Sequence, residues 1–221
     1  MKLKKSLGVL IAGIACVCVG VALFIVGATA DFSGPDGSTN LYVMEAEYIN
    51  LDGVSGAGVS SDQSGVEMIY GDGTEAQKNM GWSNGYYVGY TYATNLTLTF
   101  TFNADTDSTA TINLRLGSEL GELLLDSSTF AVKLNGEIID YGNLSIANSS
   151  MESMVFEDKL VTTTAQLVAG ENTLELVVLY NNFMNGARTG GPCVDCVKIE
   201  TTANLTWTDK TDNPGRRGEI G

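Results

Sequence analysis

Residues 96–102 read LTLTFTF, a strict alternation of large apolar residues with threonine. Successive side chains of a strand point to opposite faces, so this period of two predicts a β-strand with one apolar and one threonine face. The same alternation returns at 110–116, 130–134 and 174–178, with turn residues such as Asn135-Gly136 between the runs. Short strands joined by Gly- and Asn-rich turns predict an all-β fold, an antiparallel sandwich or barrel.

The N-terminal segment differs from the rest of the chain and is set apart from the fold. Residues 1–5 carry three lysines, residues 7–27 are apolar and uncharged, and residues 28–30 read ATA, a small-residue cleavage pattern. This composition predicts export, with 1–30 either a signal peptide that is removed or a signal anchor that crosses the membrane through 7–27. Both outcomes place the remaining residues outside the cell, secreted or anchored to the outer face of the plasma membrane.

Composition narrows the classes of function. The 221 residues hold 12 Lys and Arg against 26 Asp and Glu, a net charge of −14. A surface this acidic repels nucleic acid and attracts divalent cations. The chain has no histidine, which excludes Ser-His-Asp and Cys-His catalysis and the usual zinc sites that contain histidine. We therefore expect a neutral ligand or a cation, and no nucleic-acid partner.

Local composition also divides the chain. Residues 31–40 are rich in Gly, Ser and Asp, and we expect them to form a linker. The patterned stretch at 41–202 predicts one β-sandwich domain, and the polar, Gly-rich stretch at 203–221 predicts a tail or linker. Within the domain, Cys193 and Cys196 have the spacing of a redox or zinc motif, but they run into a predicted strand. We expect a packed cysteine at 196 and a looser one at 193.

Two carboxylates stand out on the first predicted strand, LYVMEAEYI at 41–49. Glu45 and Glu47 are two positions apart, so a continuous strand would point both to the same face. Such a pair can face solvent, bind a hard cation or perform acid–base catalysis. Glycoside hydrolysis needs two carboxyls on either side of a scissile bond, and neighbours on one strand do not straddle a substrate. Cation binding is therefore the better functional interpretation, because calcium takes carboxylate oxygens as ligands.

A series of short segments, in this order, resembles families 6 and 35 of carbohydrate-binding modules. The resemblance covers about 41–202. Its segments are EAE at 45–47, GYYVG at 85–89, the threonine-rich 95–103, INLRLGS at 112–118, VKLNGE at 132–137, LVAGENTL at 167–174 and PCVDCVKI at 192–199.

The resemblance implies a jelly-roll β-sandwich with a structural calcium ion. The implied calcium ligands are Glu45, Glu47 and Asp195, completed by backbone carbonyls from a loop between 54 and 68. The resemblance also implies a sugar site among loops at one end of the sandwich, where an aromatic ring stacks on a sugar face. The candidates by type and loop position are Trp82, Tyr86, Tyr90, Tyr141, Asn181, Asn182 and Arg188.

The function implied is non-catalytic binding of an extracellular polysaccharide or glycan, which would keep a cell, or a catalytic domain on a longer parent chain, near that glycan. One position departs from the family pattern. These modules often carry an asparagine two residues before the final aspartate, and here that residue is Cys193, whose thiol is a weak hydrogen-bonding partner. The alternative is therefore a structural or adhesive surface domain that has lost sugar binding and contacts protein partners. A third interpretation makes Glu45 and Glu47 catalytic acids.

Overall fold

The computed structural model describes residues 38–51, 54, 67–70, 83, 86–89, 91, 93–118, 121–147, 155–180 and 190–212. For 67–70 and Tyr86 only the backbone is described. The predicted export or anchor segment at 1–30 and most of the predicted linker lie outside these residues. In the described part of the chain, no helix is long and apolar enough to cross a membrane.

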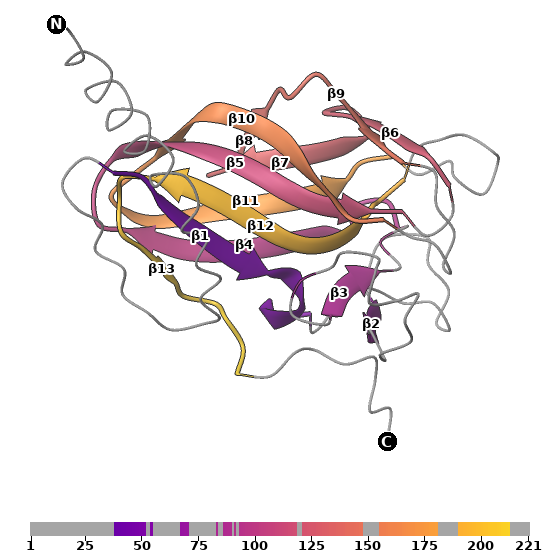
Figure 1. Ribbon diagram of the computed structural model, residues 1–221, viewed down its shortest axis with the longest axis horizontal. Helices are drawn as coiled ribbons and strands as arrows, with labels where there is room; N and C mark the ends of the chain where they lie inside the picture. Colours follow the sequence, from indigo (N-terminus) through magenta and orange to yellow (C-terminus); the bar gives the residue numbers. More distant parts are fainter. Residues whose placement is uncertain are drawn as a thin grey trace, which may run out of the picture. The chain divides into compact units, whose positions relative to one another are not determined.

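The described strands form two large antiparallel sheets and one smaller pair (Figure 1). The first sheet has the order β10 (Glu157–Leu167), β5 (Ser108–Gly117), β12 (Cys193–Thr201), β3 (Tyr86–Gly89) and β2 (Glu67–Tyr70), and β1 (Asn40–Glu45) also pairs with β12. The register of β1 runs from Asn40 opposite Thr201 to Glu45 opposite Cys196. The first sheet therefore joins the two ends of the domain.

The second sheet carries the stretch of alternating threonines. Its order is β13 (Leu205–Trp207), β4 (Thr97–Ala104), β11 (Gly170–Val178), β7 (Phe130–Leu134) and β8 (Glu137–Ile139). A separate two-stranded sheet consists of β6 (Leu123–Asp126) and β9 (Asn143–Ile146). All of the pairings are antiparallel, so the predicted all-β antiparallel class is confirmed.

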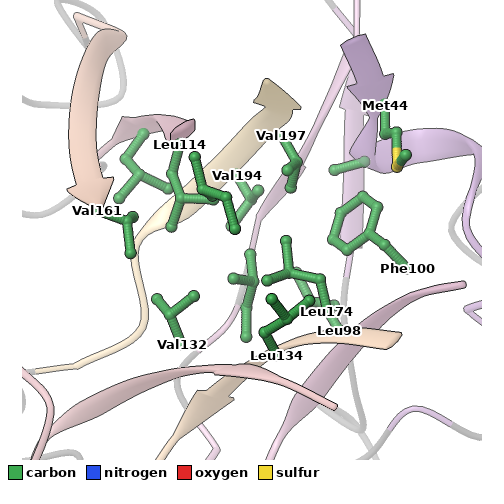
Figure 2. Packing of buried hydrophobic residues seen from close by; sticks show 14 of the residues in the cluster. Met44, Leu98, Phe100, Leu114, Val132, Leu134, Val161, Leu174, Val194 and Val197 are labelled. Atoms are coloured by element: carbon green, nitrogen blue, oxygen red, sulfur yellow. The ribbon is translucent and has the colours of Figure 1, made fainter. Parts of the chain in front are cut away.

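A single hydrophobic core lies between the two large sheets. Leu98, Phe100 and Leu174 come from the second sheet and pack near Leu114 and Val197 of the first (Figure 2). Along β4 the apolar residues are buried while the threonines between them are half-buried, as the alternation predicts. The chain is thus a β-sandwich, because one apolar face of each sheet is removed from water by the other.

The predicted turn at Asn135-Gly136 is confirmed. Both residues have positive φ, 53° and 85°, the conformation that a tight hairpin between β7 and β8 requires and that Asn and Gly tolerate. The backbone N–H of Asn135 donates to the carbonyl of Thr173 at 2.8 Å, and its side-chain oxygen accepts from the N–H of Thr173 at 2.9 Å. The turn is therefore fixed to the neighbouring strand β11.

The first strand is shorter than predicted. β1 ends at Glu45, and the next residues form one turn of 3-10 helix, η1 (Ala46–Tyr48), closed by a hydrogen bond from the N–H of Ile49 to the carbonyl of Ala46 at 3.3 Å. The prediction that Glu45 and Glu47 share one face of a continuous strand is therefore wrong. The turn buries Ala46 and Glu47, which a strand of period two would place on opposite faces.

The sandwich also extends beyond residue 202, where we predicted a polar tail to begin. Leu205–Trp207 forms β13, which pairs with β4. Asp209 then accepts a hydrogen bond from the N–H of Thr101 at 2.9 Å, and Thr211 donates from its N–H to the carbonyl of Tyr48 at 2.7 Å. Three residues are too few to show an alternation, so no strand could be predicted at Leu205–Trp207. Residues 213–221 lie outside the described part.

Candidate cation site and sugar-binding residues

A bulge in β12 sets up the candidate cation site. Val194 lies opposite Leu116 of β5, and Cys196 lies opposite Arg115, so Asp195 is the extra residue on β12. A bulge bends the strand locally and redirects a side chain. Because Glu45 of β1 is opposite Cys196, the bulge brings three potential ligands together. The ligand atoms of Glu45, Asp195 and Cys196 all lie within 4.8 Å of one another.

Ser83 holds the two carboxylates of this cluster. Its N–H donates to Asp195 Oδ1 and Oδ2 at 2.9 and 3.0 Å. Its hydroxyl oxygen lies 2.5 Å from Glu45 Oε2 and 3.0 Å from Asp195 Oδ2. A hydroxyl has one proton to donate, so it can serve only one of these oxygens at a time. Ser83 therefore holds the two acids close together, but it has too few donors to satisfy all of the carboxylate oxygens that face it.

Burial makes the charged forms of both acids costly. Asp195 is completely buried. Burial, with a smaller contribution from the charge of Glu45, raises the pKa of Asp195 to about 7, although the hydrogen bonds from Ser83 and the charge of Arg115 oppose this rise. Burial likewise raises the pKa of Glu45, against the lowering effect of Ser83. A positive charge placed between the two carboxylates would offset this cost.

One such charge belongs to the chain itself. Arg115 Nε lies 3.3 Å from Asp195 Oδ2, and Arg115 Nη1 lies 3.1 Å from Asp158 Oδ1 on β10. Asp158 is half-exposed and also accepts from Lys198 Nζ, at 2.8 Å on each oxygen. A continuous set of charges thus runs from the buried Asp195 to the outer surface of the first sheet.

The donor set fits a hard divalent cation such as calcium. Glu45 and Asp195 supply carboxylate oxygens, the ligands that calcium prefers. Burial raises the pKa of the Cys196 thiol far above its usual range, with the charges of Asp195 and Glu45 adding to the effect, so the thiol stays neutral and is a poor ligand for a hard ion. Glu47 is completely buried on η1, but the described group within 4.8 Å does not include it.

The predicted sugar-binding residues fall mainly outside the described part of the chain. This holds for Trp82, Tyr90, Asn181, Asn182 and Arg188, while Tyr86 is described by its backbone alone, at the start of β3. Tyr141 is described and is half-buried. Its hydroxyl donates to the carbonyl of Phe130, and its ring packs against the core, so its contacts are those of a structural residue.

The described neighbours of these candidates nevertheless lie together. Thr91 Oγ1 donates to the carbonyl of Pro192 at 2.5 Å. A Cβ on Gly191 would lie 1.8 Å from the carbonyl oxygen of Thr91, so only glycine allows this approach. Tyr90 directly precedes Thr91, and Arg188 precedes Gly191 by three residues. The segment after β3 and the segment before β12 are therefore in direct contact at Thr91, Gly191 and Pro192.

Several residues of the cation site were not predicted. Ser83 lies in the stretch Gly81-Trp82-Ser83-Asn84-Gly85, and nothing in this stretch signals a contact with an acid. Arg115 lies in the segment INLRLGS, where alternation places it on the outer face of its strand. Its partner Asp158 lies on β10, a strand that the alternation did not predict. Cys196 is buried as predicted, and Cys193, predicted to be looser, is buried as well.

Comparisons with known proteins find similarity in structure alone. No family model and no curated protein matches the sequence. Among solved structures, a family 35 carbohydrate-binding module from an environmental isolate is 15% identical, with a TM-score of 0.47 over 76% of this chain and 97% of that chain. A family 35 module from Clostridium thermocellum is 17% identical, with a TM-score of 0.42 over 72% of this chain and 97% of that chain.

Two other matches are of different kinds. A GH26-CBM35 β-(1,4)-mannanase from Podospora anserina is 19% identical, with a TM-score of 0.46 over 79% of this chain but 30% of that chain. The C-terminal family 6 module of a Zobellia galactanivorans laminarinase is 18% identical, with a TM-score of 0.41 over 72% of this chain and 98% of that chain. Carbohydrate-binding modules of families 35 and 6, which the sequence resembles, are thus among the solved structures to which this chain is similar.

Proposed function

We propose that the chain is a non-catalytic, extracellular carbohydrate-binding module with a jelly-roll sandwich and a structural calcium ion. The observation that carries the proposal is the buried cluster of Glu45 and Asp195. These acids are far apart in the sequence, and the order of the family-like segments predicts that they share a metal ion. Their close approach at the bulge of β12 supports that prediction.

Calcium would be held by Glu45 and Asp195, with Glu47 as the third acid. Bound there, it would supply two positive charges that offset the buried carboxylates. It would also hold β1 to β12, since Glu45 and Asp195 lie on these two paired strands. Because the ion would bind the folded chain alone, it would raise the free energy of unfolding by mass action.

The sugar site would lie around β3, whose following segment meets the segment before β12. Trp82, Tyr86 and Tyr90 offer rings that can stack on the apolar face of a sugar, and Asn181, Asn182 and Arg188 offer donors for its hydroxyls. The contact of Thr91 with Gly191 and Pro192 supports this location, because it joins the two segments. Tyr141 takes a structural role instead of a ligand contact.

The direct test of this proposal is retention of the protein on glycans. With calcium present, we expect binding to at least one plant, host or microbial polysaccharide on an array, with release by the corresponding free sugar. Trp82→Ala should reduce retention at least tenfold while the melting temperature stays within a few degrees of the wild-type value, whereas Tyr141→Phe should keep retention. An array with no retained glycan would overturn the sugar-binding proposal.

A second candidate function is a surface domain that binds protein partners. The observation that favours it is Cys193, which is buried at 3% exposure at the position where the related modules often carry an asparagine. No polar amide is then offered to a ligand from this first residue of β12. Capture of a defined protein partner that is unaffected by added sugars would support this candidate.

A longer parent chain is also part of the proposal. In the mannanase from Podospora anserina, the matched part is 30% of the whole chain. We propose two alternatives for this module. It is joined to a catalytic domain that acts on a glycan, on a longer parent chain, or it is anchored to the membrane through residues 7–27.

A further inference from the structure

We propose that Arg115 is a built-in counter-cation of the calcium site, which competes with the divalent ion for Asp195 and is drawn outward by Asp158. The inference rests on the calcium part of the proposed function. It adds a residue that sets the affinity of the site, and it connects that affinity to charges on the outer face of the first sheet.

The strand register places the four relevant residues in one row. Glu45 lies opposite Cys196, Cys196 lies opposite Arg115, and Arg115 lies opposite Asp158. The row crosses β1, β12, β5 and β10, which lie side by side in the first sheet (Figure 1). Paired residues in adjacent strands are direct neighbours. The guanidinium of Arg115 lies between the buried Asp195 of β12 and the exposed Asp158 of β10.

The inner contact matters most when no divalent ion is bound. Asp195 is completely buried, and a buried carboxylate without a positive partner is costly. Arg115 Nε at 3.3 Å from Asp195 Oδ2 supplies that partner, and the Arg115 side chain is itself 22% exposed. The chain can therefore keep Asp195 partly compensated without any added ion.

The contact with Asp158 gives the guanidinium of Arg115 a second partner. Asp158 Oδ1 is 3.1 Å from Arg115 Nη1, and the Asp158 side chain is 45% exposed. Lys198 Nζ competes for the same carboxylate from 2.8 Å. Arg115 presents several N–H groups in a planar fork, so it can keep its contact with Asp158 while it gives up Asp195.

A divalent ion on Asp195 would lie close to the guanidinium, and like charges at short range in a buried site repel strongly. Binding of the ion therefore requires that Arg115 leaves Asp195 and relies on Asp158. Two consequences follow. Removal of the Arg115 charge strengthens calcium binding, and removal of the Asp158 charge weakens it, although neither residue is a calcium ligand.

The test compares calcium affinities by calorimetric titration of the full chain after chelation. We expect Arg115→Gln to bind calcium at least tenfold more tightly than the wild type. Lys133→Gln removes the same charge from β7 of the second sheet and should change the affinity less than about twofold, because exposed distant charges are screened by salt. Asp158→Asn should weaken binding several-fold, and its exposed position makes it a safe variant if Arg115→Gln does not fold.

A second readout is thermal unfolding. Without calcium, Arg115→Gln should melt at a lower temperature than the wild type, and its rise on calcium addition should be larger. If calcium binds the wild type but Arg115→Gln binds equally or less tightly and Asp158→Asn is unchanged, the role of Arg115 is wrong and the calcium site stands. If none of these proteins binds calcium, both the calcium site and this inference are overturned.

Discussion

Two buried polar clusters in this sandwich are built in opposite ways. At one turn, the amide of Asn172 uses all of its donors and acceptors on internal partners: it donates to the carbonyls of Val168 and Gly170 at 2.7 and 3.0 Å, and it accepts from Val168 N–H and Asn135 Nδ2 at 3.0 Å each. At the bulge of β12, the two carboxylates of Glu45 and Asp195 share Ser83, and Arg115 pairs with Asp195. The neutral cluster is complete, whereas the acidic one keeps a net negative charge.

This difference determines what each cluster can do. A neutral amide with every hydrogen bond satisfied adds stability and order and needs no ligand. Buried acids in excess of their counter-charges destabilise the chain unless they are protonated or hold a cation. The asparagine cluster is therefore structural, and the acidic cluster is the place where an added ion would change the energy of the fold.

The largest expected effect is the loss of calcium binding in Asp195→Asn. The substitution keeps the shape of the side chain and an oxygen for the Ser83 N–H, but it removes the buried charge. We expect calcium affinity to fall more than about 100-fold, equal to roughly 3 kcal/mol. Calorimetric titration measures this, with Asn172→Ala as the control, which should leave the affinity within about twofold. Full affinity in folded Asp195→Asn would contradict the assignment.

A smaller effect, of a different kind, is expected for Asn172→Ala. This change removes a buried amide and with it four hydrogen bonds at the turn between β10 and β11, so the free energy of unfolding should fall by about 2 kcal/mol. The loss should be the same with and without calcium, because the turn is independent of the acidic cluster. Urea denaturation measures it. A loss of unfolding free energy that calcium reversed would show that the two clusters are not independent.

Removing the hydroxyl that the two acids share should have a weaker effect. In Ser83→Ala the backbone N–H still donates to Asp195, so we expect the calcium-free protein to lose about 1.5 kcal/mol of unfolding free energy. With calcium the loss should be smaller, because the ion takes over the compensation of the carboxylates. Paired urea denaturation curves with and without calcium test this, and an equal loss in both would count against it.

Stability should also change with pH in the calcium-free protein. The pKa of Asp195 is about 7 in the folded chain against an ordinary value of 3.8, so between these values the folded chain binds a proton that the unfolded chain has lost. The free energy of unfolding should therefore fall as pH rises from about 4 to about 7, and the raised pKa of Glu45 acts in the same direction. Asp195→Asn should flatten this slope. Stability that rose across the same window would contradict the expected protonation.

The fold could be predicted where one face of a regular strand is buried. The apolar positions of β4 alternate without interruption, and so do those of β5 and β11, so these strands were visible in the sequence. β10 was not predicted, because the apolar Leu160 is exposed and the exposed Thr163 separates the buried Val161 from the buried Ala165. An exposed apolar residue and a threonine at an alternate position obscure the period of two on which the prediction depends.

The candidate site could be predicted only in part, for a related reason. The resemblance paired Glu45 with Asp195, and the described cluster contains both. Glu47 lies on a 3-10 turn instead of the strand, and the bulge that redirects Asp195 leaves no mark in a single sequence. Arg115 meets Asp158 only because β10 lies beside β5. Contacts of this kind depend on register between distant segments, which local pattern does not contain.

The most direct test of the cation cluster on which the proposed function rests is thermal unfolding of the wild-type protein after chelation, followed by stepwise return of calcium. We predict that the melting temperature of the wild type rises with calcium concentration and saturates, and that Asp195→Asn responds little to the same addition. A wild-type melting temperature that chelation and calcium leave unchanged would contradict it.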